Sequence, residues 1–166
     1  MPAEPRRALG IDPGTARLGY AVVEQRGSAL SLLTAGVLAT KAARPMPTRL
    51  RELHDGLLGI IREQAPTEMA VEELFFAKNV NTAIAVGQAR GIALLAAAMA
   101  DLAVYEYKPM QVKQAVHGYG LATKAQVGEM VRVLLNLAAV PTPDDAADAA
   151  AIAICHLNSI QLSGVL

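Results

Sequence analysis

The first 40 residues alternate short apolar runs with polar turns, a pattern that is typical of β-strands. Residues 8–12 are short and apolar, and residues 20–25 are rich in valine. A turn at residues 26–28 leads into a third region, which consists of two runs at 29–34 and 36–40. Because turns this short join neighbouring strands, we expect an antiparallel meander.

After residue 45 the apolar positions recur mainly at helical spacing, interrupted by two further strand-like runs. The expected helices cover residues 48–64, 81–99, 109–116, 123–137 and 143–162, and the expected strands cover residues 69–74 and 104–107. Thr123 and Gln126 have the spacing of a capping box. This order predicts an α/β fold in which helices flank a mixed five-stranded sheet, and the whole chain, residues 1–166, is expected to form a single domain.

The overall charge points to no class of partner, because 15 basic residues balance 15 acidic ones. The distribution along the chain is uneven. Between residues 74 and 132, six basic side chains stand against three acidic ones. The middle section is therefore basic, and the molecule can bind a partner through groups of both signs.

Cys155 is the only cysteine, which excludes an intramolecular disulfide and a zinc site built from several cysteines. We expect it to be a small buried side chain on the last helix. The first ten residues lack the apolar stretch of a signal peptide, and the most apolar helical run, residues 91–100, is too short to span a bilayer. The expected location is the cytoplasm, without membrane contact.

Two of the expected strands carry a carboxylate near their end. Asp12 closes the first run, and Glu72 lies in the run at 69–74. Side chains alternate between the faces of a strand, so Asp12 shares its face with Gly10, and Glu72 shares its face with Ala70. Such small residues leave room for a bound group beside each acid, at the strand ends where ligands bind in sheets with parallel connections.

The last expected helix begins with the sequence TPDDAADAAAIAI. Asp145 and Asp148 project from neighbouring points on one face of this helix. Capping of the helix end is the favoured interpretation of Asp144, because an acid suits the positive end of the helix dipole. Capping does not explain Asp148, which lies one turn further in among alanines, so this carboxylate is expected to have a partner.

Convergence of these four carboxylates would require neutralisation. The four are Asp12, Glu72, Asp145 and Asp148. Two carboxylates about 4 Å apart repel by on the order of 4 kcal/mol at an effective dielectric constant near 20. No lysine or arginine is adjacent to them in the sequence, so either some are protonated or divalent cations lie among them. Ligands that are all oxygen favour Mg²⁺ or Mn²⁺ over Zn²⁺, and two such ions about 3.5–4 Å apart form the clamp used for phosphoryl displacement.

Five stretches of the chain resemble, in order, the RuvC family of Holliday junction resolvases. They are LGIDPGTARLGYAVV, AVEELFFAKN, GQARG, YKPMQVKQAVHGYGLATKAQV and DDAADAAAIAICH. The likeness extends over residues 9–156, and the combination is far more specific than any one piece. The GIDPGT stretch alone also resembles the phosphate loop of actin-like ATPases and sugar kinases.

The resemblance implies an RNase H-like fold, a homodimer, and paired symmetric nicking of four-way DNA junctions in recombination and repair. It implies that the four carboxylates bind the metal ions and carry catalysis, with Asp145, not Asp144, at the first position of the D-x-x-D spacing. One ion would activate water and the other would stabilise the leaving oxygen, which yields 5′-phosphate and 3′-hydroxyl ends. A branch-migration complex of RuvA and RuvB type proteins is a further implied partner.

Cations must hold the DNA, because four carboxylates repel it. The resemblance points to Lys113 and Lys124 for this role. Lys124 also stands at a helix N-terminus, where a bound phosphate would reverse the penalty for a cation, although a solvated surface lysine is the alternative interpretation. Arg90 and Lys78 are further DNA-binding candidates. Arg90 can equally be a structural ion-pair partner, and Lys78 an ordinary surface lysine.

The two phenylalanines follow Glu72 closely, and adjacent residues at a strand end cannot both face the core. The resemblance favours Phe75 as the residue that contacts unpaired bases at the crossover. Phe76 is then expected to be a core residue. The apolar face of residues 81–99 is expected to serve both the core and the dimer. The three histidines have no metal-ligand spacing and are expected to be structural or surface residues.

Two other functions remain open at this point. An actin-like phosphotransferase would use the Asp12 turn, but such proteins contain two copies of the fold and a second glycine-rich phosphate loop, which 166 residues do not supply. A junction-binding protein that does not cut, or an RNase H-like nuclease with another substrate, is the second alternative. The presence of all four carboxylates argues against a protein without catalytic activity.

Overall fold

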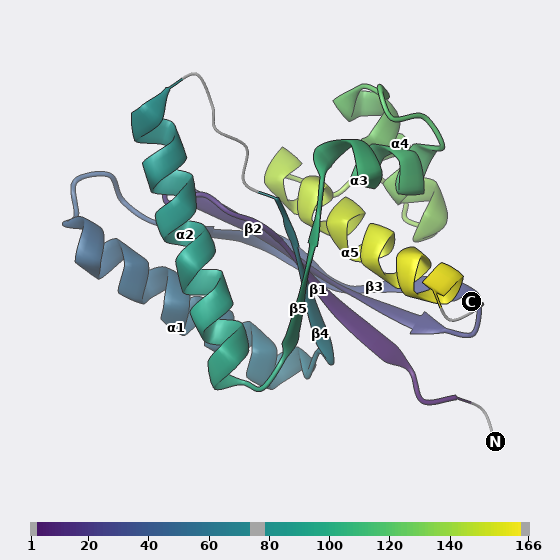
Figure 1. The fold of residues 1–166 in the computed structure, drawn as a ribbon, viewed down its shortest axis with the longest axis horizontal. Helices are drawn as coiled ribbons and strands as arrows, with labels where there is room; N and C mark the ends of the chain where they lie inside the picture. Colours follow the sequence, from purple (N-terminus) through teal and green to yellow (C-terminus); the bar gives the residue numbers. More distant parts are fainter. Residues whose placement is uncertain (1–2, 74–78, 164–166) are drawn as a thin grey trace.

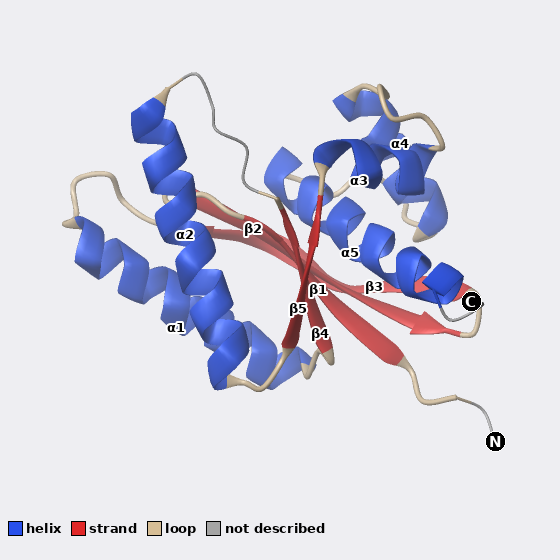
Figure 2. Ribbon diagram, viewed as in Figure 1, coloured by secondary structure: helices blue, strands red, loops and turns tan. Residues whose placement is uncertain are grey.

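The structure, a computed structural model, describes residues 3–73 and 79–163. In this part of the chain a five-stranded sheet carries helices on both faces (Figures 1 and 2). The strands are β1 (Arg6–Asp12), β2 (Arg17–Arg26), β3 (Ala29–Ala39), β4 (Glu68–Glu72) and β5 (Ala103–Tyr107). The helices are α1 (Met46–Gln64), α2 (Val80–Met99), α3 (Pro109–His117), α4 (Lys124–Leu134) and α5 (Asp144–Ser163). The predicted order of strands and helices is confirmed.

The sheet has the strand order β3-β2-β1-β4-β5. β1, β2 and β3 pair antiparallel, whereas β4 pairs parallel to β1 and β5 parallel to β4, which is the predicted mixed sheet. One difference concerns the two runs predicted between residues 29 and 40. They form one strand, β3, whose register shifts opposite Val22 and Val23. A bulge of this kind takes up the extra residue, so that the strand continues.

The alternation of side chains along the strands separates two cores. Leu9 and Ile11 of β1 belong to the buried cluster that includes α1 and α2. Ala8 belongs to the opposite cluster, which includes a run of alanines of α5 together with residues of α3 and α4. Figure 1 shows α1 and α2 on one side of the sheet and α3, α4 and α5 on the other. Asp12 follows Ala8 and Gly10 on its strand face and therefore lies on the α5 side.

The backbone of α5 lies directly on β1 and β2 because two glycines admit it. A Cβ atom at Gly10 of β1 would lie 2.0 Å from the carbonyl oxygen of Ala149, and one at Gly19 of β2 would lie 2.2 Å from the carbonyl oxygen of Asp145. Real Cβ contacts do not come this close, so no other residue fits without displacing the helix. The two glycines thus seat the helix segment that carries Asp145 and Asp148.

Replacing Gly10 by alanine is expected to push α5 away from β1 and to destabilise the protein by roughly 1–3 kcal/mol, because the added methyl group overpacks a rigid backbone contact. The matched control is Gly59→Ala on α1, where a Cβ would meet nothing within 4 Å. That variant is expected to gain roughly 0.5–1 kcal/mol from the better helix propensity of alanine. Urea unfolding of both variants measures the difference. Equal midpoints for Gly10→Ala and the wild type would contradict this seating of α5.

Helix α2 has one buried side and one exposed apolar side. Its alanines at 89, 93, 96 and 97 are buried against the sheet, whereas Val80, Ile84, Leu95 and Met99 are 50–70% exposed. The helix is longer than the ten-residue run singled out above. By length and composition alone, it is the one helix among the described residues that is able to cross a membrane.

Candidate active site

The four predicted carboxylates line one cavity of about 530 Å³. Asp12 ends β1 and Glu72 ends β4, and these strands are parallel neighbours in the register that pairs Ile11 with Val71. Asp145 and Asp148 enter from the first two turns of α5. The convergence that the sequence predicted is therefore present, with ligands from two strands and one helix.

Three of the four carboxylates form a compact group. Asp12, Asp145 and Asp148 each offer an oxygen, and the three oxygens lie within 4.8 Å of one another. Glu72 lines the same cavity but stands outside this group. It is close enough for the charge of Asp148 to raise its pKa, after the larger effect of burial. Glu72 thus lies in the same cavity as the compact group but is not part of it.

Burial and mutual repulsion favour the protonated form of these acids. The pKa of Asp12 rises from its ordinary value of 3.8 to about 7, first because of burial and then because of the charges of Asp148, Asp145 and Glu72. Burial also raises the pKa of Asp148, although its bond to Lys124 opposes the shift. The group therefore resists carrying its full negative charge unless a cation balances it.

Two cations reach the cluster from distant parts of the chain. Nζ of Lys124 lies 3.1 Å from Oδ2 of Asp148, and Nε of Arg17 lies 3.1 Å from Oδ2 of Asp145. Lys124 begins α4 after the predicted capping box, in which Gln126 N donates to Thr123 Oγ1 at 3.2 Å. Lys124 is thus a surface lysine, 67% exposed in its side chain, that is bound to a site carboxylate in the structure.

The sequence interpretation missed Arg17. The strand was expected to begin at residue 20, but pairing with β3 extends β2 back to Arg17. Arg17 then shares a strand face with Gly19, the residue that contacts α5. The signal was present in the alternation of residues 17, 19 and 21, but it becomes visible only once the strand is known to start there.

The compact group fits a divalent cation. Its donors are all carboxylate oxygens, the ligands of hard ions such as Mg²⁺, Mn²⁺ and Ca²⁺. Oδ2 of Asp145 is buried and accepts no hydrogen bond, although Arg17 Nε is near it. An unsatisfied buried anionic oxygen is costly, and a cation at this point would satisfy it. The donor chemistry and the orphaned oxygen together support a metal centre here.

The remaining DNA-binding candidates fall in three places. Lys113 of α3 lines the cavity beside Glu72. Arg90 of α2 forms an ion pair with Glu106 of β5, which is the structural role left open above, and its side chain is only 17% exposed. Phe75, Phe76 and Lys78 lie outside the described residues.

Three further expectations are resolved near the end of the chain. Cys155 is buried on α5, as predicted. His156 is fully buried and hydrogen-bonded, which makes it one of the structural histidines that were expected. Asp144 starts α5 and lines a neighbouring cavity of about 410 Å³, outside the compact group of three.

In metal-free buffer, Asp12→Asn is expected to be more stable than the wild type at neutral pH. Because folding raises the pKa of Asp12 from 3.8 to about 7, its stabilising neutral form is complete below pH 4 and is lost as the pH rises through 7. Asparagine mimics the neutral acid at every pH. The gain should therefore be near zero at pH 4 and reach on the order of 2–4 kcal/mol above pH 7.

Urea unfolding of both proteins between pH 4 and pH 8 checks this expectation. Titrating groups that do not interact with Asp12, such as the buried His156, are common to the two proteins and cancel in the difference. A difference that stays flat over this range would show that Asp12 is not forced toward its neutral form by its surroundings.

Residues 8–156 match the protein family described as crossover junction endodeoxyribonuclease RuvC. The chain is 63% identical over 150 residues to the crossover junction endodeoxyribonuclease RuvC of Chloroflexus aggregans, covering 90% of this chain and 92% of that protein. It is 55% identical over 154 residues to the corresponding protein of Desulfitobacterium hafniense, covering 93% of each. Among solved structures, T. thermophilus RuvC in complex with Holliday junction substrate matches with a TM-score of 0.91 and 40% identity, over 95% of this chain and 96% of that chain.

Proposed function

The chain belongs to the RuvC family of crossover junction endodeoxyribonucleases, and from this premise we propose that it resolves four-way (Holliday) DNA junctions by paired symmetric nicks. It is a nuclease with the RNase H-like fold of that family. The observation that carries the proposal is the cavity in which carboxylates from β1, β4 and α5 meet beside Lys113 and Lys124. This combination suits a substrate that brings phosphate groups and a reaction that needs bound cations.

The proposed reaction is hydrolysis of a phosphodiester bond with Mg²⁺ or Mn²⁺ as cofactor, with two ions in each site. The bound ions supply Lewis-acid stabilisation of the charge that develops at the scissile phosphate. The products are a 5′-phosphate and a 3′-hydroxyl. These ends restore intact duplexes after ligation, which suits an enzyme of recombination and repair.

The chain's own residues have separate tasks in this proposal. Asp12, Asp145 and Asp148 form the compact group that holds the cations, and Glu72, which lines the same cavity, completes the set. Lys113 and Lys124 neutralise the DNA phosphate that approaches the carboxylates. Phe75 is proposed to contact unpaired bases at the crossover.

A homodimer is the proposed working form, because two symmetric nicks require two symmetric sites. The exposed apolar side of α2 supports an interface there, since burying Val80, Ile84, Leu95 and Met99 removes a large apolar surface from water. A second copy of the chain accounts for this surface without a membrane. We further propose that the enzyme acts in the cytoplasm, together with a branch-migration complex of RuvA and RuvB type proteins.

The test is incubation of the protein with a synthetic mobile four-way junction and Mg²⁺. We expect nicks at symmetric positions in two opposing strands, with ends that a ligase seals, and no cutting of a linear duplex of the same sequence. Binding without cutting at any sequence would favour the alternative of a catalytically silent junction-binding protein. Cutting of the linear duplex at the same rate would indicate an RNase H-like nuclease with another substrate.

A further inference from the structure

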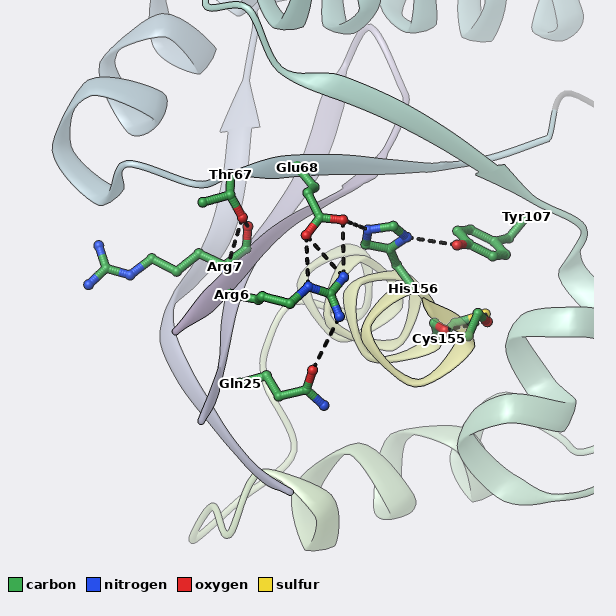
Figure 3. Close-up of polar contacts among 9 residues, drawn as sticks. Arg6, Arg7, Gln25, Thr67, Glu68, Tyr107, Cys155 and His156 are labelled. Atoms are coloured by element: carbon green, nitrogen blue, oxygen red, sulfur yellow. Dashed lines mark hydrogen bonds and ion pairs between the residues drawn. The ribbon is translucent and has the colours of Figure 1, made fainter. Parts of the chain in front are cut away.

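A buried polar cluster lies at the far end of the elements that carry the carboxylates (Figure 3). His156 of α5 lies between two partners: its Nε2 is 2.5 Å from Glu68 Oε2, and its Nδ1 is 2.7 Å from the hydroxyl of Tyr107. Arg6 donates to both oxygens of Glu68, at 3.0 and 3.1 Å. We call Arg6, Glu68 and His156 the anchor cluster.

Every polar atom of His156 has a partner, which defines its protonation state. Burial lowers the pKa of His156, so the imidazole is neutral at neutral pH. Burial raises the pKa of Tyr107 to about 12, so its hydroxyl keeps its proton. Tyr107 therefore donates to Nδ1, and Nε2–H donates to the Glu68 carboxylate, whose charge is balanced by Arg6. This chain of hydrogen bonds is directional at each step.

The anchor cluster and the carboxylates belong to the same three elements. β1 runs from Arg6 to Asp12 and β4 runs from Glu68 to Glu72. On α5, His156 lies eight residues after Asp148. β1 and β4 thus each contribute one residue to the attractive cluster at one end and one carboxylate to the repulsive cluster at the other, and α5 contributes to both clusters from positions about two turns apart.

Between the two clusters, α5 packs on the sheet through apolar and backbone contacts. Its buried side chains in this stretch are alanines together with Ile152 and Ile154, and its backbone lies over Gly10. Apolar contacts are non-directional, so they constrain the position along the helix axis less sharply than hydrogen bonds do. Hydrogen bonds have a narrow range of distance and angle, and a buried bridge across α5 and β4 supplies the sharper constraint.

We propose that the anchor cluster positions α5 along its axis, and so sets the spacing between the two α5 aspartates and the carboxylates of β1 and β4. His156 and Glu68 are positioning residues in this proposal, which rests on the proposed metal-dependent function. Loss of the bridge lets α5 shift, so that the carboxylates hold the cations less well while the DNA-binding surface is unchanged.

The test compares His156→Leu and Glu68→Ala with the wild type in the full-length protein. The first measurement is Mn²⁺ binding by calorimetry, which does not depend on cutting. The second is single-turnover junction cutting across a Mg²⁺ titration, and the third is junction binding in Ca²⁺. We expect each variant to need about 10-fold more metal for half-maximal binding and cutting, as for partners that orient metal ligands, with junction affinity changed less than about threefold.

Two controls separate positioning from simple destabilisation. Leu157→Ala removes the next buried side chain of α5, outside the anchor cluster, and is expected to lower the unfolding midpoint without changing the metal requirement. His156→Gln keeps a side chain that can both donate and accept, and is expected to restore most of the metal affinity. If His156→Leu does not fold, Glu68→Ala carries the test.

The outcomes distinguish this inference from the proposed function. A wild-type protein that does not cut the junction contradicts the function, whereas the calorimetric comparison still tests the anchor. Wild-type metal affinity in a folded His156→Leu or Glu68→Ala protein overturns the inference. A metal requirement that rises equally in Leu157→Ala overturns it as well, because the effect would then follow stability alone.

Discussion

Asp148→Asn is expected to reduce junction cutting by at least about 10³-fold, which corresponds to about 4 kcal/mol of lost transition-state stabilisation. The side chain keeps its size but loses the charge that belongs to the compact group with Asp12 and Asp145. Removing one of four mutually repelling acids does not weaken the fold, so the variant should remain folded. Junction affinity, measured by fluorescence anisotropy in Ca²⁺, should change less than about threefold, because the DNA is held mainly by cations.

The matched control for this variant is Asp144→Asn. Asp144 has the same chemistry and begins the same helix, but it lies outside the compact group. Replacing Asp144 is expected to change cutting less than about threefold, because the favourable interaction that is lost is a helix-dipole contact of roughly 0.3–1 kcal/mol. Loss of both binding and cutting in Asp148→Asn would make Asp148 a structural residue. Loss of cutting in Asp144→Asn would show that the wrong aspartate had been assigned to the motif.

Lys124→Ala is expected to lower the rate of cutting by on the order of 10²-fold, or about 3 kcal/mol. This lysine contacts Asp148 at 3.1 Å and lines the cavity that the phosphate must enter. Its removal leaves Asp148 without its cationic partner and the DNA without one phosphate contact. The logarithmic slope of junction binding against salt concentration should become shallower by about 1.

Arg132→Ala is the matched control for Lys124. It removes one cation from the same helix, but Arg132 is bound to Glu129 two turns away from Lys124. Its replacement is expected to change cutting less than about threefold, as for other exposed ion pairs. Equal effects of the two substitutions would mean that Lys124 acts only through the general charge of α4.

The strands and their faces could be predicted because a period of two along the chain is a local property. The alternation in residues 8–12 assigns Leu9 and Ile11 to one core and Ala8 to the other, and the structure has this arrangement. The start of β2 was predicted three residues late, since residues 17–19 gain their extended structure from pairing with β3, and Gly19 from pairing with β1 as well. Tertiary hydrogen bonds, not local propensity, decide where that strand begins.

The carboxylates could be recognised because unpaired acids among small apolar residues need an explanation wherever they occur. Their partners could not be recognised in the same way. Arg17 reaches Asp145 across 128 positions of the sequence, and Lys124 reaches Asp148 across 24. His156 was interpreted, with the other histidines, as a structural or surface residue, since its partner Glu68 lies 88 positions away.

The sequence by itself therefore determined which carboxylates are the candidates for the chemistry, because residue type and local period are properties of the chain. Only the tertiary structure decided which charges balance which, how closely α5 approaches Gly10 and Gly19, and where the helix is anchored. These features depend on distances of a few ångströms between elements that are far apart in the chain. Such distances arise when the sheet forms and α5 packs across it, because electrostatic and steric energies depend on separation in space and not on separation in sequence.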